Sequence, residues 1–166
     1  MENSAFVNYY IKELEAEYTS SRKCIERIPE SSYDFKPHPS SMELRYLVLL
    51  TADIPRWITY MIKEGEVDFA TYEQFEWKTP DELTNHFDEA FKEAIESLKS
   101  ITDEDLKGDF HLKRNGEVLF TQSIFEGIGS TIHHWVHHRG QLTVYMRISE
   151  IPVPSIYGPS ADDRVF

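Results

Sequence analysis

The chain has 166 residues, with 17 lysines and arginines, 29 aspartates and glutamates, seven histidines and one cysteine, and its formal net charge is −12. This length predicts a single domain, 1–166, which can bury a core without a disulfide or a structural metal. The acidic balance, with no basic stripe, argues against a nucleic-acid-binding protein. The sequence contains no apolar run of about eighteen residues, so no membrane span is predicted. The N-terminus lacks the basic start and apolar core of a signal peptide. Since one cysteine cannot form an intrachain disulfide, we expect a cytoplasmic protein.

Two amphipathic helices are predicted in the first half of the chain. The first covers about 3–27 and ends before Pro29, and its apolar face repeats at three- and four-residue steps. The second opens at 40–43, where a serine hydroxyl is expected to cap the helix and Glu43 to reach back to the cap, and it closes at Gly65. The inward-facing residues of this second helix are Leu47, Leu50, Ile54, Trp57 and Met61.

The second half predicts two more helices with a short hairpin between them. The third helix begins at the sequence TPDE, 79–82, which combines a capping box with proline at the first helical position. Asn115 and Gly116 form the dipeptide that best supplies two positive φ angles, so we expect a tight hairpin there. The fourth helix covers about 123–149, and the proline-rich tail after it is irregular.

These elements predict an all-α fold, an antiparallel four-helix bundle with a short hairpin or irregular segment between helices three and four. A long connection joins the second helix to the third. The core of such a bundle is also where metal and ligand sites are built, from side chains on facing helices.

Four of the seven histidines lie within six residues of the fourth helix. They form two pairs with i,i+4 spacing, which places both imidazoles of a pair on one helix face. From the angular spacing of about 100° per residue, the pair His134 and His138 borders the core, whereas His133 and His137 face water. Such a pair is also compatible with a hydrogen-bonded or surface role, and two imidazoles are fewer than the three protein ligands usual in catalytic zinc sites.

The sequence around this pair resembles a known family. The stretch HWVHHRGQL at 134–142 contains the pattern HxxxHRGQL, and the tail at 153–162 reads VPSIYGPSAD. Further matches in the first half are DFKP at 34–37, IPRW at 54–57 and DF at 68–69. Together these motifs cover nearly the whole chain and are similar to the DinB-like (DinB/YfiT) superfamily.

The resemblance implies a four-helix bundle, commonly a homodimer, that holds a divalent metal (Zn, Ni or Fe) with three histidines. Two of these ligands come from the fourth helix and match His134 and His138, and the third comes from the second helix. Characterised relatives are enzymes that use a thiol such as bacillithiol, mycothiol or glutathione, and many others are described only as metal-dependent hydrolases. A small-molecule or thiol substrate is therefore implied here.

This chain departs from the family at the third ligand. The histidine of the second helix precedes the tryptophan by seven residues in the family, and that position is Leu50 here. Leucine has no lone pair, so the three-histidine site is incomplete unless another group replaces the histidine. Asp53, one turn along, offers a carboxylate oxygen, although a solvated carboxylate is the simpler interpretation. The remaining histidines are isolated: His38 is expected in a loop, His86 on an exposed helix face and His111 in the hairpin, each with a structural or surface role.

Three further residues of the fourth helix border the expected pocket. Gln141 shares the face of His134 and is expected to orient a ligand imidazole, while Arg139 and Tyr145 have either pocket or packing roles. Two functions remain open. One is a metal-dependent hydrolase or thiol-dependent transferase with an incomplete three-histidine site. The other is a catalytically inactive bundle that acts as a small-molecule binding or oligomeric scaffold.

Overall fold

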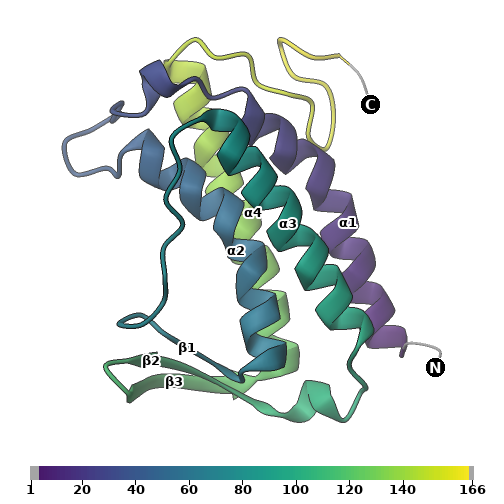
Figure 1. Cartoon of the computed structure of the whole chain (residues 1–166). Coiled ribbons are helices and arrows are strands. Elements are labelled where there is room, and N and C mark those ends of the chain that lie inside the picture. The colour runs from purple at the N-terminus through teal and green to yellow at the C-terminus, as the bar shows by residue number, and fades with distance from the viewer. Residues whose placement is uncertain (1–3, 165–166) are drawn as a thin grey trace.

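The computed structural model describes residues 4–164 and contains the four expected helices, which pack side by side as a bundle (Figure 1). They are α1 (Ala5–Glu26), α2 (Leu44–Lys63), α3 (Pro80–Lys99) and α4 (Ile124–Ile148). The predicted start of the first helix at residue 3 lies outside the described residues. Within residues 4–164, none of the helices is both long and apolar enough to cross a membrane.

The bundle is not antiparallel throughout, which corrects the expected topology. In Figure 1, α1 and α4 run in one direction, while α2 and α3 both run in the other. The segment 69–79 between β1 (Glu66–Asp68) and α3 returns along the length of α2 before α3 begins. A 20-residue helix is about 30 Å long, a distance that eleven extended residues can span. The long connection therefore makes α2 and α3 parallel neighbours.

A small sheet at one end of the bundle corrects the all-α expectation. The strands β2 (Asp109–Arg114) and β3 (Glu117–Ser123) form the predicted hairpin, and β1 pairs in parallel with β2 in the order β1-β2-β3. The turn residues Asn115 and Gly116 have φ angles of 52° and 78°, as the hairpin prediction requires. Asp68 joins the strand β1 to this turn, because its carboxylate accepts the backbone N–H groups of both turn residues at 3.0 and 2.7 Å.

The helix starts show which local signals decide the structure. The capping box at Thr79 and Glu82 is present as predicted, and a second one joins Ser123 to Glu126 at the start of α4. The expected serine cap of α2 is wrong, since its N-cap residue is Glu43 and no side chain caps it. Instead, the first backbone N–H of α2, that of Leu44, donates to the carbonyl of Phe35 at 2.9 Å. A tertiary contact therefore sets the start of α2.

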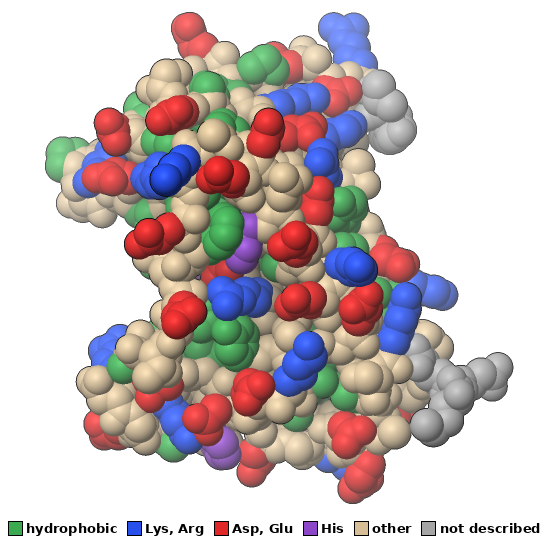
Figure 2. Space-filling model, viewed as in Figure 1, with side chains coloured by type: hydrophobic (Ala, Val, Ile, Leu, Met, Phe, Trp, Pro, Cys, Tyr) green, Lys and Arg blue, Asp and Glu red, His purple; other side chains and the backbone are tan. Residues whose placement is uncertain are grey.

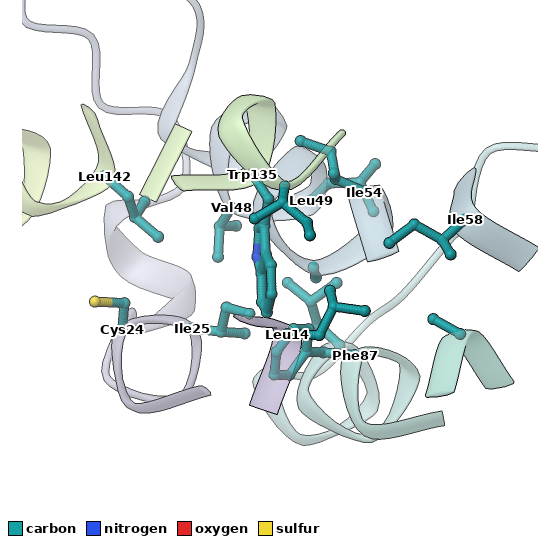
Figure 3. Close-up of a cluster of buried hydrophobic side chains, with 14 of the residues drawn as sticks. Leu14, Cys24, Ile25, Val48, Leu49, Ile54, Ile58, Phe87, Trp135 and Leu142 are labelled. Carbon is teal, nitrogen blue, oxygen red and sulfur yellow. The ribbon is translucent and has the colours of Figure 1, made fainter. Parts of the chain in front are cut away.

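The core is built around the indole of Trp135 on α4, which is 1% exposed (Figure 3). It meets Phe87 of α3 with ring centroids 5.8 Å apart, and apolar side chains of α1 and α2 belong to the same buried cluster. The labelled members from α1 and α2 are Leu14, Cys24, Ile25, Val48, Leu49, Ile54 and Ile58. This packing fixes the rotation of α4, and with it the direction in which the histidines on the same helix point.

Candidate functional site

The histidine pair lies where the angular spacing on α4 predicts it. His138 is 8% exposed and His134 is half-buried, whereas His133 and His137 are exposed. The Nε2 atoms of His134 and His138 lie 2.8 Å apart, and Nδ1 of His138 is 2.8 Å from Oε1 of Gln141. Because the Gln141 oxygen only accepts, His138 donates from Nδ1 and accepts at Nε2 from the N–H of His134.

Burial favours the neutral form of both imidazoles. The pKa of His134 is lowered, first by loss of water around the ring and then by the positive charges that His138 and His137 would carry. The pKa of His138 is lowered by the same burial, which its hydrogen bond to Gln141 partly opposes. A neutral imidazole has a lone pair, so the pair is electrostatically suited to bind a ligand through nitrogen.

These lowered pKa values predict a pH-dependent stability. The unfolded chain binds protons at these two histidines more readily than the folded chain does. Their protonation therefore lowers the free energy of unfolding, and this loss is absent well above pH 6.5, where both states are neutral. The free energy of unfolding decreases as the pH falls below 6.5 and through the pKa values of the folded chain. We expect the denaturation midpoint in urea to fall between pH 7.5 and pH 5 less steeply for the variant His134→Gln/His138→Gln than for the parent. Equal slopes for the two proteins would contradict this assignment.

The side of α2 next to the pair offers packing groups instead of a third nitrogen ligand. Trp57 contacts His134 edge to face, with ring centroids 6.2 Å apart. Leu50 is partly buried and packs against the hydrophobic core. The position where the family resemblance implies a histidine therefore contributes only hydrocarbon.

Asp53, the candidate replacement ligand, is hydrogen-bonded elsewhere. Its Oδ1 accepts the Nε2–H of His86 at 2.7 Å, its Oδ2 accepts the hydroxyl of Tyr72, and the Arg56 guanidinium lies 3.7 Å from Oδ1. The Asp53 side chain is 9% exposed, and its partners lie on α3 and in the segment 69–79. Burial and the adjacent Asp53 charge together raise the pKa of Tyr72, so its hydroxyl stays protonated and donates.

His86 was expected on an exposed helix face, and the structure corrects this. Its side chain is 11% exposed, and its ring stacks on Phe75 with centroids 3.8 Å apart and an interplanar angle of 6°. The covering residues Phe75 and Tyr72 lie in the irregular segment before α3, where no periodicity indicates which way a side chain points. The spacing of Asp53 and His86 on two different helices carries no sequence signal either.

The residues present do not fit the three-histidine metal centre that the family resemblance implies. Within residues 4–164, no group of three or more histidine, cysteine, aspartate or glutamate side chains is arranged to hold a metal ion. His134 and His138 supply two nitrogens, Leu50 supplies none, and the oxygens of Asp53 are engaged by His86 and Tyr72. The pair is thus short of the usual three protein ligands.

Arg139 is part of a buried ionic cluster that links α1, α4 and the tail. It is 2% exposed and forms an ion pair with Glu17, and it also donates to Ser20 at 2.9 Å and to Tyr157 at 2.7 Å. The Tyr157 hydroxyl in turn donates to Glu17. The tail tyrosine is therefore bound to this cluster.

Tyr145 and the two remaining isolated histidines also make structural contacts. The hydroxyl of Tyr145 donates to the backbone carbonyl of Met42 at 3.1 Å, which ties α4 to the segment before α2. His111 bonds to Thr121 across the hairpin, and His38 accepts a backbone N–H within its loop. These contacts agree with the structural roles expected for His38 and His111.

Comparisons with known proteins agree with this architecture. The DinB superfamily model matches residues 13–142 of the chain. A DinB-like protein of Bacillus subtilis, YjoA, is 21% identical with a TM-score of 0.71, over 95% of this chain and 100% of that one. A DinB-like protein of Bacillus cereus is 19% identical, with a TM-score of 0.65 over 92% of this chain and 95% of that one.

Two other relatives are similar to this chain. A solved member of the DinB family from Exiguobacterium sibiricum is 14% identical, with a TM-score of 0.67 over 90% of this chain and 95% of its own. The uncharacterized protein YrdA of Bacillus subtilis is 53% identical over 32 residues, a match that spans only 19% of each chain. The superfamily model, which covers most of the chain, decides the assignment: this protein belongs to the DinB superfamily.

Proposed function

We propose that this protein is a DinB-like bundle without a complete metal centre, which acts as a small-molecule binding protein and not as a metal-dependent enzyme. The observation that carries the proposal is the donor set: Leu50 occupies the position of the third histidine, and Asp53 is bound to His86 and Tyr72. A small molecule or thiol is the expected ligand, and the proposed protein is a cytoplasmic homodimer.

Metal analysis of the purified protein tests the proposal. The chain would be produced without an affinity tag and without chelator, and its Zn, Ni and Fe contents would be measured by mass spectrometry. We expect well under one ion per chain, close to the content of the matched variant His134→Ala/His138→Ala. One firmly held ion per parent chain, absent from the variant, would contradict the proposed loss of the centre.

A metal-dependent hydrolase or thiol-dependent transferase is the second candidate function. It is favoured by the convergence of two Nε2 atoms at 2.8 Å and by Gln141, which holds one ring in the way that outer residues orient metal-bound imidazoles. For this function a third ligand is required, and Asp53 would have to leave His86 and Tyr72 to supply it. The donor set therefore supports the binding protein better than the enzyme.

A further inference from the structure

A second polar cluster lies between α2 and α3, apart from the imidazole pair of α4. Its centre is His86, whose Nε2–H donates to Asp53 at 2.7 Å while the ring rests on Phe75. A carboxylate oxygen can only accept, so Nε2 carries a proton, and in the singly protonated tautomer Nδ1 is an acceptor. Nδ1 has no hydrogen-bond partner among residues 4–164.

His86 lines a cavity of about 240 Å³ on the surface between α2 and α3. The other lining residues are Arg56, Phe75, Glu89, Ala90 and Glu93. The face shown in Figure 2 presents acidic, basic and histidine side chains close together over these two helices. The lining of this cavity thus combines two apolar residues, Phe75 and Ala90, with a histidine and three charged side chains.

The charged groups of this cavity differ in whether they already have partners. Arg56 donates to the carbonyl of Glu73 at 3.1 Å and to the hydroxyl of Tyr60 at 3.0 Å, and it lies 3.7 Å from Asp53. By contrast, the carboxylates of Glu89 and Glu93 make no ion pair or hydrogen bond with any residue of the described chain. The groups still able to bind a ligand are therefore acceptors.

An adjoining cavity of about 220 Å³ shares Arg56 and Glu93 with the first. It is lined by Thr59, which is 8% exposed and whose Oγ1 has no hydrogen-bond partner in residues 4–164. Its other charged residues, Lys63 and Glu64, are of opposite sign. A buried hydroxyl without a partner is uncommon in folded proteins.

We propose that the cavity lined by His86, Glu89 and Glu93 binds a small organic amine in its ammonium form. This inference rests on the proposed binding function. An ammonium group has three N–H donors and a positive charge, which match the Nδ1 of His86 and the carboxylates of Glu89 and Glu93. A carboxylate or phosphate ligand would face the same two glutamates and be repelled. The ligand class thus follows from the unpaired acceptors.

Isothermal titration calorimetry in about 0.15 M salt, where weak surface attractions are screened, tests the inference. The probes are n-butylamine, butyrate, butanol and tetramethylammonium. We expect butylamine to bind at least tenfold more tightly than each of the others. Equal affinity for tetramethylammonium, which has the charge but no N–H donor, would overturn the role of the acceptors, and absence of butylamine binding would overturn the site.

The double variant Glu89→Gln/Glu93→Gln tests whether butylamine binds in the cavity lined by His86. Both side chains are exposed, so the variant keeps the fold, and we expect it to weaken butylamine binding at least tenfold. The control Glu96→Gln/Glu117→Gln removes the same charge from exposed positions elsewhere and is expected to bind as the parent does. Equal weakening in both variants would show an effect of net charge and overturn the site.

The outcome of this titration can be separated from the proposed loss of the metal centre. The metal content of each preparation is measured on the same sample. A metal-poor protein that does not bind butylamine overturns the amine site alone. A protein with one ion per chain contradicts the proposed function, whatever its response to butylamine.

Discussion

Replacing Leu50 with histidine is expected to raise the affinity for Zn²⁺ on the order of a hundredfold, because it supplies the third nitrogen that the pair on α4 lacks. Position 50 lies on the same helix as Trp57, which contacts His134, and its side chain is only partly buried. The imidazole can therefore be accommodated without a large loss of packing. Competition against a chromophoric zinc chelator measures the change.

Two controls make the Leu50→His result specific. Leu50→Asn introduces a polar side chain of similar size without an imidazole and is expected to leave zinc affinity within a few-fold of the parent. In Leu50→His/His138→Ala, the gain should disappear because only two histidines remain. If the parent already binds zinc as tightly as Leu50→His, then the donor set is complete without position 50 and the proposed function is wrong.

Replacing Arg139 with methionine is expected to destabilise the protein by about 3–5 kcal/mol, since the change leaves the charge of Glu17 buried without its partner. Ser20 and Tyr157 lose their hydrogen bonds to the guanidinium in the same substitution. Urea denaturation followed by circular dichroism gives the free energy of unfolding. The double variant Glu17→Gln/Arg139→Met, which removes both charges, should recover a large part of the loss.

The same helix provides a matched control for this prediction. Arg147 forms an ion pair with Asp162 at 2.6 Å, but its side chain is 51% exposed. Arg147→Met is therefore expected to cost less than about 1 kcal/mol. If the Arg147 and Arg139 variants lose similar stability, the burial of the Glu17 ion pair does not have the effect assigned to it.

The parts of the fold that local chemistry specifies could be predicted from the sequence. The capping box at Thr79 and Glu82 gives the start of α3, and the turn at Asn115 and Gly116 gives the hairpin, because each signal lies within a few residues. The strand β1 could not be predicted, since three residues are too few to show an alternating pattern. The start of α2 depends on the distant carbonyl of Phe35 and shows no local signal either.

In the candidate site, too, contacts within one helix could be predicted from the sequence, whereas contacts between separate segments could not. The burial of His134 and His138 follows from the angular spacing on one helix, and so does the position of Gln141 beside them. The contacts of Asp53 with His86 and Tyr72 join three separate segments, and only the folded chain shows that they meet. The sequence leaves Arg139 with either a pocket or a packing role, because its ion pair with Glu17 depends on how α1 packs against α4.

Anomalous X-ray scattering from a crystal soaked in zinc tests whether the metal centre is lost, because it reports the occupancy of the ion and its ligands together. We expect either no peak between His134 and His138 or a weak one whose only protein ligands are these two nitrogens, with Asp53 still bound to His86. A fully occupied ion at this pair, with Asp53 turned away from His86 to complete the coordination, would show that the metal centre is intact and contradict the proposed function.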